Sequence, residues 1–291
     1  MSSEVSSGGN PREIVKQLGL KPLRSLGQNF MMDASVIEAI VRGAEIDPTQ
    51  DVLVEVGPGT GALTSQLADS GVPLLCVELD RGLASYLDET FGPKGVRVIQ
   101  GDVLEKKRSL NPLLLEQLHH WKSEGKRIKW ISNLPYNILT PLLWNLLQVR
   151  DLWQKGIFLV QMEFAQRLRS VPGDDSYGPL GALSELYLTT KTLRKVSRRS
   201  FWPVPDVDSA VISVDPLEDV PSLEIGFQEF LKKGFSQRRK KLSKLISRPE
   251  LPVAEIEGAL EDMNYPGDAR AESLVAQDLL LIYEKTSKRF N

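Results

Sequence analysis

The sequence predicts an α/β protein in which a doubly wound sheet is followed by a small all-helical C-terminal domain. Short apolar runs alternate with amphipathic stretches between residues 51 and 160. Helical patterns with no obvious strand fill the part beyond residue 220. A chain of 291 residues is long for one core and short for three, which favours one full domain and one smaller one.

The apolar runs have the length and composition of buried parallel strands. They are Val52 to Val56, Leu74 to Leu79, Val96 to Ile99, Ile128 to Ile131 and Ile157 to Val160. Between them the pattern predicts helices over 63–70, 83–90 and 141–149. This alternation of strand and helix is typical of a doubly wound sheet.

The chain changes character near residue 220. A Pro-rich stretch at 201–205 and turn-rich residues around Pro216 and Pro221 precede four helical patterns, at 227–235, 238–246, 253–263 and 273–284. The Ser/Gly-rich amino terminus has no such pattern. We therefore expect a flexible segment at 1–24, a ligand-binding domain at 25–220 and a helical domain at 221–291.

The formal net charge of -2 hides an uneven distribution. Residues 45–102 carry ten acids and three bases, whereas residues 232–248 carry eight bases and no acid. A second basic cluster consists of Lys191, Arg194, Lys195, Arg198 and Arg199. Blocks of this kind suit the phosphates of a nucleic acid, although solvated surfaces would give the same pattern.

A single cysteine, Cys76, excludes an internal disulfide and a cysteine-rich metal site. His119 and His120 lie together with no other ligand pattern around them, so we expect no metal. The polar first ten residues and the lack of an apolar run of about 18 residues argue against an export signal and a membrane span. These features predict a cytoplasmic protein.

A glycine turn follows the first strand of the predicted sheet. Val52 to Val56 runs into Gly57-Pro58-Gly59-Thr60-Gly61 and then into a helix, which lets a ligand approach the backbone closely. Glu78 ends the next strand, 21 residues after Gly57, where a carboxylate can bind both hydroxyls of a ribose. A dinucleotide would suit these residues equally well.

Two later features favour a methyl donor. Asp102 follows the third strand, where its carboxylate could bond an adenine amine, although an aspartate in a turn has the same appearance. The more specific signal is Ser132-Asn133-Leu134-Pro135-Tyr136-Asn137, directly after the fourth strand. We interpret this loop as the catalytic element.

The chemistry of a base amine explains these residue types. The lone pair of an adenine amine is delocalised into the ring, so attack on a methyl sulfonium requires the nitrogen to become tetrahedral. The Asn133 side-chain oxygen and a carbonyl of the Leu134-Pro135 turn can accept its hydrogens, while Tyr136 offers a face for the extruded base. Proximity to the donor supplies most of the rate, and no strong general base is needed.

At this point the sequence resembles the ribosomal RNA adenine dimethyltransferases, specifically the small-subunit type known in bacteria as KsgA. Separate, spaced matches carry the resemblance: Gly27 to Phe30 (GQNF), Glu55 to Thr64 (EVGPGTGALT), Val77 to Asp80 (VELD), Asn133 to Leu142 (NLPYNILTPL), Phe201 to Val211 (FWPVPDVDSAV) and Phe235 to Lys240 (FSQRRK). They extend over nearly the whole chain. The resemblance implies a class I, Rossmann-like methyltransferase fold.

The resemblance also implies roles for particular residues. Those implied to contact S-adenosylmethionine are Asn29, Met31, Gly57, Gly59, Glu78, Asp102 and Asn133. Those implied to engage the target adenine are Asn133, Pro135, Tyr136 and Phe201, although Phe201 beside prolines would equally be plain packing. Met31 and Leu139 depart from the family, which usually has leucine and serine there. Methionine suits an apolar contact, and Leu139 bears on how the loop is held.

The family implies a substrate and a partner as well. It modifies two adjacent adenosines near the 3′ end of small-subunit ribosomal RNA, with two methyls each, within an immature small ribosomal subunit. The residues expected to grip RNA phosphates are those of a basic helix: Arg238, Arg239, Lys240 and Lys241. We expect a monomer.

Three other functions are compatible with parts of the sequence. A large-subunit methyltransferase of the antibiotic-resistance type shares the GQNF element and the donor loop, but the carboxyl half resembles the small-subunit type. A non-catalytic RNA-binding protein would not need the whole set of site residues. A nicotinamide dehydrogenase leaves the Asn133 loop and the basic carboxyl domain unexplained.

Overall fold

The computed structural model describes residues 9–23, 26–105, 109–135 and 138–287. Its internal contacts divide the chain into two compact units. Unit 1 contains the residues up to 165 together with 190–216, and unit 2 contains 166–189 together with the residues from 217 onward. The segment 166–189 thus groups with the C-terminal helices, whereas the sequence analysis assigned it to the first domain.

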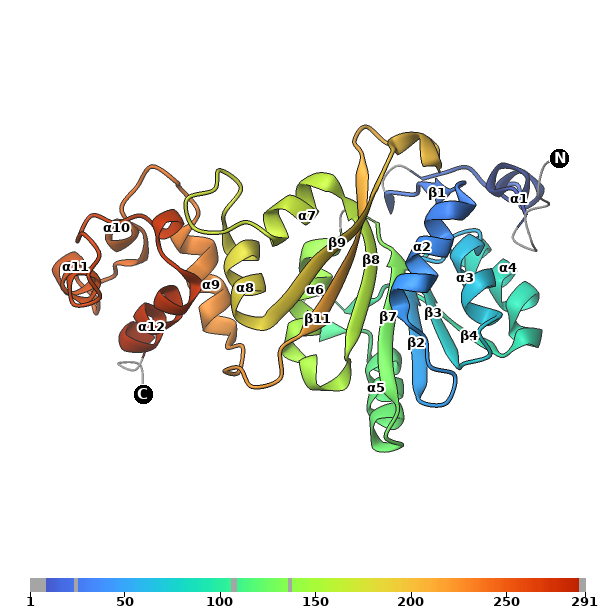
Figure 1. The fold of residues 1–291 in the computed structure, drawn as a ribbon, viewed down its shortest axis with the longest axis horizontal. Coiled ribbons are helices and arrows are strands. Elements are labelled where there is room, and N and C mark those ends of the chain that lie inside the picture. The colour runs from blue at the N-terminus through green and yellow to red at the C-terminus, as the bar shows by residue number, and fades with distance from the viewer. Residues whose placement is uncertain (1–8, 24–25, 106–108, 136–137, 288–291) are drawn as a thin grey trace. The chain divides into compact units, whose positions relative to one another are not determined.

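A seven-stranded sheet forms the centre of unit 1, in the order β4-β3-β2-β7-β8-β11-β9 (Figure 1). Its strands are β2 (Asp51–Val56), β3 (Leu74–Glu78), β4 (Val96–Gln100), β7 (Arg127–Asn133), β8 (Lys155–Gln161), β9 (Leu188–Val196) and β11 (Ser209–Pro216). Neighbouring strands from β4 to β8 are parallel, and β11 is antiparallel to β8. The five predicted strands and the doubly wound α/β class are confirmed.

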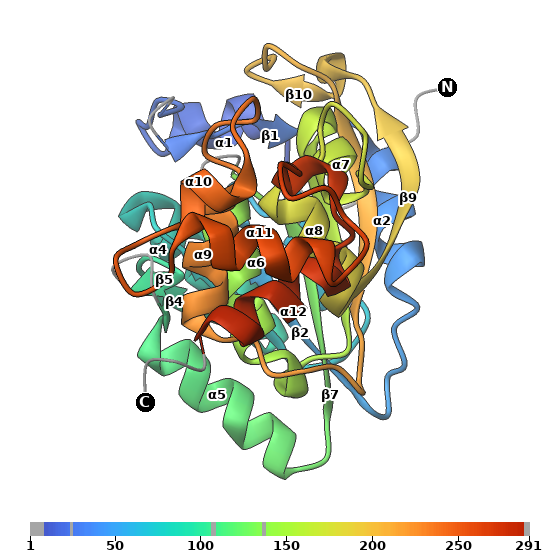
Figure 2. The same ribbon diagram turned by 90° about the vertical axis from the view of Figure 1, so that its left-hand side faces the viewer.

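Helices cover both faces of this sheet. They are α2 (Ala34–Ala44), α3 (Ala62–Ala68), α4 (Arg81–Phe91), α5 (Pro112–Ser123) and α6 (Leu139–Gln148), with short 3-10 turns η2 (Gly92–Lys94) and η3 (Arg150–Leu152). One core cluster joins apolar residues of α2, α3 and α4 to alternate residues of the strands, such as Leu53 and Cys76. Figure 2 shows α2 and α5 on opposite sides of β7.

The amino-terminal segment is partly folded, which corrects the expectation of a flexible 1–24. Helix α1 (Pro11–Gln17) begins with Asn10 as its cap, whose side chain accepts from the Arg12 N–H, and with a proline in its first turn. Val15 is buried in a small cluster with Phe30 and Leu83. The Asn-Pro cap was the sequence signal for this helix.

Two small sheets complete unit 1. Strand β1 (Phe30–Met31) pairs with β10 (Phe201–Trp202), which follows the turn η4 (Arg198–Ser200). Strands β5 (Leu104–Glu105) and β6 (Ser109–Leu110) form an antiparallel pair. Helix α7 (Met162–Leu168) begins directly after β8. The β1–β10 pair brings together segments that lie 170 residues apart.

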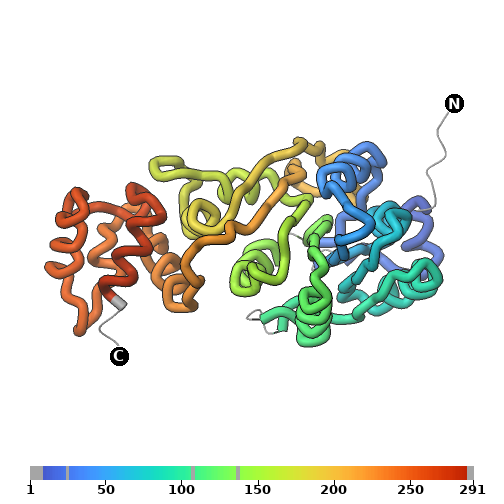
Figure 3. Tube along the Cα trace, turned by 60° about the horizontal axis from the view of Figure 1, so that its bottom comes forward, coloured from blue at the N-terminus to red at the C-terminus, as the bar shows by residue number. Residues whose placement is uncertain are grey.

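Unit 2 is helical in the part of the chain that the structure describes, as expected. Its elements are α8 (Pro179–Tyr187), α9 (Ile225–Gly234), α10 (Leu242–Ile246), α11 (Val253–Glu261), η5 (Ala271–Ser273) and α12 (Ala276–Ser287). The segments drawn in orange and red lie together in Figure 3. The side chains of Phe227, Leu260 and Leu279 in these helices are buried. Helix α10 begins at Leu242, so the prediction of a basic helix at 238–241 is wrong. Those residues form turns because exposed cations have no apolar partners to fix a helix there.

The parallel strands end at a common edge of the sheet. Strands β2, β3 and β7 end at Val56, Glu78 and Asn133. In open α/β sheets ligands bind outside the carboxyl ends of the strands. Within the described residues, no helix is long and apolar enough to cross a membrane.

Candidate functional site

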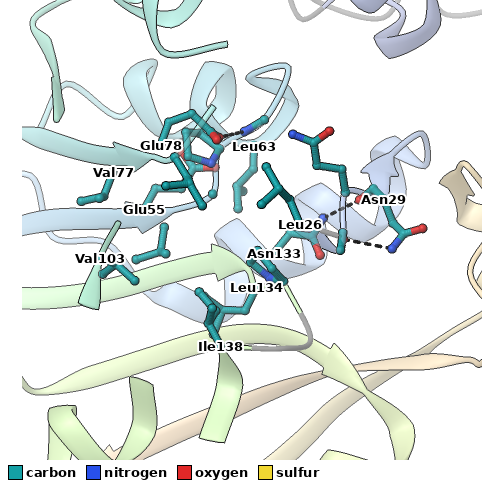
Figure 4. Close-up of a pocket in the computed structure, with 18 of the residues that line it drawn as sticks. Leu26, Asn29, Glu55, Leu63, Val77, Glu78, Val103, Asn133, Leu134 and Ile138 are labelled. Atoms are coloured by element: carbon teal, nitrogen blue, oxygen red, sulfur yellow. Dashed lines mark hydrogen bonds between the residues drawn. The ribbon is translucent and has the colours of Figure 1, made fainter. Parts of the chain in front are cut away.

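A cavity of about 220 Å³ lies at the carboxyl ends of β2, β3 and β7 (Figure 4). Its lining comes from five separate stretches of unit 1, namely 26–31, 55–63, 77–79, 101–104 and 133–141. Every residue implied to contact S-adenosylmethionine is among the lining residues. The fold therefore brings these predicted residues to one place.

The glycine turn forms one wall of the cavity. Gly57 and Gly59 have φ angles of 66° and 59°, which side chains rarely adopt. A Cβ at Gly59 would lie 3.0 Å from ring atoms of Phe30, and one at Gly57 would lie 3.2 Å from Pro135 Cδ. Glycine is needed at both positions because the turn is closely flanked by the walls that face it.

Glu78 lies at the end of β3 and is almost fully buried. Its Oε2 accepts from the Gly59 N–H at 3.0 Å, and its Oε1 accepts from the Asp80 N–H at 2.9 Å. Burial raises the pKa of this carboxyl group above its ordinary value. Two backbone donors thus fix the orientation of the carboxylate, and each oxygen keeps a further lone pair for a ligand hydroxyl.

Asp102 lies on the same rim as Glu78. The Gly101 N–H donates to the Glu78 carbonyl at 2.8 Å, which joins the end of β3 to the residue before Asp102. Asp102 is exposed, and its Oδ1 accepts from the Leu104 N–H at 2.9 Å. Two strand ends therefore present carboxylates to one cavity.

Asn133 is the last residue of β7 and lines the cavity. Its side-chain nitrogen donates to the Asn29 carbonyl at 3.2 Å. Since the nitrogen is used in this way, the side-chain oxygen is the atom that can accept from a ligand. Ser132 fixes the strand end, because its hydroxyl accepts from the Val56 N–H at 2.8 Å.

The chain forms a turn directly after Asn133. Pro135 lines the cavity, and its carbonyl accepts from the Ile138 N–H at 3.2 Å. Leu139, the departure from the family, is buried in the first turn of α6. Tyr136 lies outside the described residues, so its predicted stacking role stays a prediction.

Phe201 does not line the cavity. It pairs with Met31 across the β1–β10 ladder and belongs to the main core of unit 1, with 3% of its surface exposed. Met31 lines the cavity from this ladder. The position of Phe201 favours plain packing, the alternative that the sequence left open.

Sequence reasoning did not single out the apolar surfaces beside the carboxylates. Leu79 and Val103 line the cavity and directly follow Glu78 and Asp102 in the chain. Leu79 is 46% exposed, so its side chain is accessible to a ligand in the cavity. The sequence did carry a signal for these surfaces, namely the apolar residue that follows each carboxylate at a strand end. A flat base whose edge is bound by a carboxylate needs apolar side chains against its faces.

Glu55 lies behind the glycine turn and is 1% exposed. The Thr64 hydroxyl donates to its Oε2 at 2.8 Å, and Cys76 Sγ lies 3.7 Å from the same oxygen. Burial raises the pKa of Glu55 to about 8. The folded protein therefore holds Glu55 as a neutral acid at pH 7, which places no second buried charge next to Glu78.

This proton has a consequence for stability. Between the ordinary pKa of 4.5 and the folded value of about 8, the unfolded chain binds fewer protons at residue 55 than the folded chain. Stability from this group therefore falls as pH rises through that window. Glu55→Gln removes the titrating group. The free energy of unfolding of this variant, relative to that of the wild type, should therefore increase by about 1.4 kcal/mol for each pH unit between the two pKa values. Urea unfolding at pH 5.5, 6.5, 7.5 and 8.5 measures this difference. A difference that does not change with pH would contradict the assignment.

Known proteins resemble this chain over most of its length. A family model described as ribosomal RNA adenine dimethylase matches residues 20–286. The ribosomal RNA small subunit methyltransferase A of Pediococcus pentosaceus is 35% identical over 289 residues, which cover 95% of each chain.

Solved structures share the fold. A dimethyladenosine transferase from Plasmodium falciparum superposes with a TM-score of 0.72 at 22% identity, covering 89% of this chain and 98% of that one. A 23S rRNA methyltransferase, ErmE, superposes with a TM-score of 0.59 at 23% identity, covering 89% of this chain and all of that one. At these identities the likeness supports the fold alone.

Proposed function

Because the chain belongs to the ribosomal RNA adenine dimethylase family, we propose that it dimethylates two adjacent adenosines near the 3′ end of small-subunit ribosomal RNA. The methyl groups come from S-adenosylmethionine and are transferred to the exocyclic amine. The observation that carries the proposal is one cavity lined by Glu78, Asp102 and Asn133. An anchored carboxylate, a second carboxylate and an oriented amide are the groups that a donor nucleoside and a target amine require.

The cavity residues fit the methyl donor. S-adenosylmethionine supplies an electrophilic methyl group on a sulfonium. Glu78, fixed by two backbone donors, is suited to both ribose hydroxyls, and Asp102 to the adenine amine. Leu79 and Val103 would cover the faces of that ring. The glycine turn keeps its backbone open to the remainder of the donor.

Asn133 is suited to the target amine. Its side-chain nitrogen donates to Asn29, so its oxygen would accept a hydrogen of the adenine amine. The carbonyl of Leu134 or Pro135 would accept the other hydrogen, and Tyr136 would stack on the base. Two acceptors favour the tetrahedral nitrogen from which the methyl is attacked. The proton leaves to water once the amine carries the new methyl.

Dimethylation adds a steric requirement. After the first transfer the amine carries a methyl group, yet it must again direct its lone pair at the donor. The site therefore needs spare room beside Asn133. The cavity extends past this residue to Ile138 and Pro141, which offer an apolar surface for that first methyl group.

The Pediococcus pentosaceus relative is a ribosomal RNA small subunit methyltransferase, and it is 35% identical over 95% of the chain, which favours the small subunit as the substrate. A non-catalytic RNA-binding protein would not need an anchored Glu78 and an oriented Asn133 in one cavity. Cytoplasmic location, an immature subunit as partner and the monomeric state remain predictions.

The test is transfer of labelled methyl groups from S-adenosylmethionine to immature small ribosomal subunits, with large subunits and deproteinised RNA in parallel. Nucleoside analysis should find dimethyladenosine in the small subunit alone. Label in the large subunit would establish the resistance-type activity. No label in any RNA would overturn the proposal of an enzyme.

The four basic residues proposed to grip RNA differ in their surroundings within unit 2. Arg238 Nε lies 2.7 Å from Glu272 Oε2, and its guanidinium also donates to the carbonyls of Asp174, Asp175 and Tyr177. Lys241 Nζ lies 3.7 Å from Glu257 Oε1. Arg239 and Lys240 are exposed. We therefore assign phosphate binding to Arg239 and Lys240, and a structural role to Arg238.

This division predicts two different phenotypes. Arg239→Ala with Lys240→Ala should weaken RNA binding about tenfold or more at 0.1 M salt and leave the unfolding midpoint unchanged, because only phosphate contacts are lost. Arg238→Ala should lower stability by about 1–2 kcal/mol, because Glu272 loses one ion-pair partner and three carbonyls lose a donor from a partly exposed side chain. Filter binding and urea unfolding of both variants measure the two effects. Equal stability of both variants would contradict the structural role of Arg238.

A further inference from the structure

Five basic residues of unit 1 form a second charged surface outside the cavity. We call it the basic strip, and it consists of Lys191, Arg194 and Lys195 on β9 with Arg198 and Arg199 in η4. We propose that the basic strip binds the phosphates of the RNA strand beside the nucleotide that enters the cavity. The inference rests on the proposed function and adds a substrate-positioning surface to the same unit as the site.

The strip is directly connected to the wall of the cavity. The Met32 N–H donates to the Ser200 carbonyl at 2.8 Å, and Met31 pairs with Phe201 in the β1–β10 ladder. Met31 itself lines the cavity. Arg199 therefore immediately precedes Ser200, whose carbonyl accepts from the residue that follows β1. Figure 2 shows β1 and β10 side by side, with β9 leading toward them.

Two of the arginines are held in place by the protein. Arg194 donates to the Ser35 carbonyl at 2.7 Å and to the Ser35 hydroxyl at 2.9 Å, which ties β9 to the start of α2. The Arg198 side chain donates to the Asp206 carbonyl at 3.3 Å, and its backbone N–H donates to Asp208 Oδ1 at 2.9 Å. These contacts fix the path of the strip and leave its other cations to meet a ligand.

Lys191, Lys195 and Arg199 remain for phosphate, and the last two are nearest in the chain to β10, which pairs with the cavity wall. Both are exposed, and within the described residues no carboxylate forms an ion pair with either. Two carboxylates bond to η4: Asp33 accepts from the Ser200 hydroxyl at 3.0 Å, and Asp208 accepts from the Arg198 N–H at 2.9 Å. Residues 190–210 carry five bases and two acids, so the surface is positive.

Protection of the sheet edge is the simpler explanation for lysines on β9. That strand is last in the order of the sheet, and exposed lysines discourage pairing with other chains. Edge protection accounts for Lys191 and Lys195, but it gives no reason for Arg198 and Arg199 in a turn beyond the strand. It also predicts no effect on RNA affinity, which makes the two explanations separable by experiment.

The test uses the full chain and small ribosomal subunits that have not been methylated, with binding measured across a range of KCl concentrations. For single-stranded RNA each phosphate contact contributes about 0.7 to the slope of log affinity against log salt, which is about fivefold at 0.1 M. Lys195→Gln with Arg199→Gln should therefore weaken binding by about 25-fold and reduce the slope by about 1.4. Donor affinity should not change, and Lys195→Arg with Arg199→Lys should retain the wild-type affinity.

The control removes two exposed cations of unit 1 from the amino ends of the strands; Lys94 pairs with Asp69 at 3.1 Å, whereas Lys122 has no ion pair within the described residues. Lys94 precedes β4 and Lys122 lies in the last turn of α5, at the amino ends of the strands. Lys94→Gln with Lys122→Gln should leave affinity within about threefold of wild type, since distant exposed charges are screened. An equal loss in this control, or no loss in the strip variant, would overturn the inference. Failure of the wild-type protein to methylate any RNA would instead overturn the proposed function, because the binding comparison does not require catalysis.

Discussion

Replacing Asn133 by alanine is expected to lower the rate of methyl transfer by about two to three orders of magnitude. Removal of one oriented group that stabilises a transition state costs about this much in other enzymes. The effect follows from the geometry, because the bond to the Asn29 carbonyl leaves the Asn133 oxygen as the acceptor. Single-turnover transfer to unmethylated small subunits measures it.

Two further measurements separate chemistry from folding. Donor affinity of the Asn133→Ala protein should stay within about tenfold of wild type, since Glu78 and Asp102 remain. Asn133→Asp retains an oxygen acceptor but loses the bond to Asn29, so its rate should lie between those of wild type and the alanine variant. A rate for Asn133→Ala within threefold of wild type would remove the amide from the mechanism.

Replacing Glu78 by alanine is expected to weaken donor binding by about two orders of magnitude or more. The carboxylate would lose two hydrogen bonds to a ribose, each worth about 1.5–3 kcal/mol with a charged acceptor. Its loss also leaves the Gly59 and Asp80 N–H groups without their acceptor. Equilibrium dialysis with S-adenosylmethionine measures the change.

The control for this prediction is Glu78→Gln, which keeps one oxygen for a backbone donor. Its donor affinity should be intermediate. RNA affinity should be unchanged in both variants, because the RNA-binding residues proposed above lie on other surfaces. A parallel loss of donor and RNA affinity would show instead that the variant disturbs the whole unit.

The sequence predicted the central sheet because its strands are simple. Parallel strands buried on both faces are continuous apolar runs, and β2 is buried at all six positions. Strand β9 was missed because it reads Leu-Thr-Thr-Lys-Thr-Leu-Arg-Lys-Val, with burial only at its two ends. Strand β9 joins the sheet by pairing with β11, which lies further along the chain. The local sequence pattern of β9 does not indicate this pairing.

The helix predicted at 238–246 failed for a related reason. Its apolar residues, from Leu242 onward, form α10, while the charged residues before them had no buried face to hold them in a helix. Arg238 is instead fixed by groups at positions 174–177 and at Glu272, far away in the sequence. A run of like charges cannot reveal such contacts.

The cavity was predicted better than the surfaces around it. Strand-end position alone brings Glu78, Asp102 and Asn133 together, since parallel strands end at one edge. Phe201 could not be placed in this way, because its burial depends on the β1–β10 ladder between distant segments. Glu55 was read only as part of a motif, and its retained proton depends on burial.

The interleaved course of the chain matters when the protein is being made. Unit 1 receives β9 and β11 only after the chain has passed through 166–189, and that excursion belongs to unit 2. Helix α8 contacts α9 and α12, which emerge from the synthesising ribosome last. All strands of the sheet are therefore synthesised before the helices against which α8 packs. A nascent chain stalled near residue 216, or a gene cut there, would expose the apolar side of α8, so the helical unit cannot be exchanged or deleted as a simple tail.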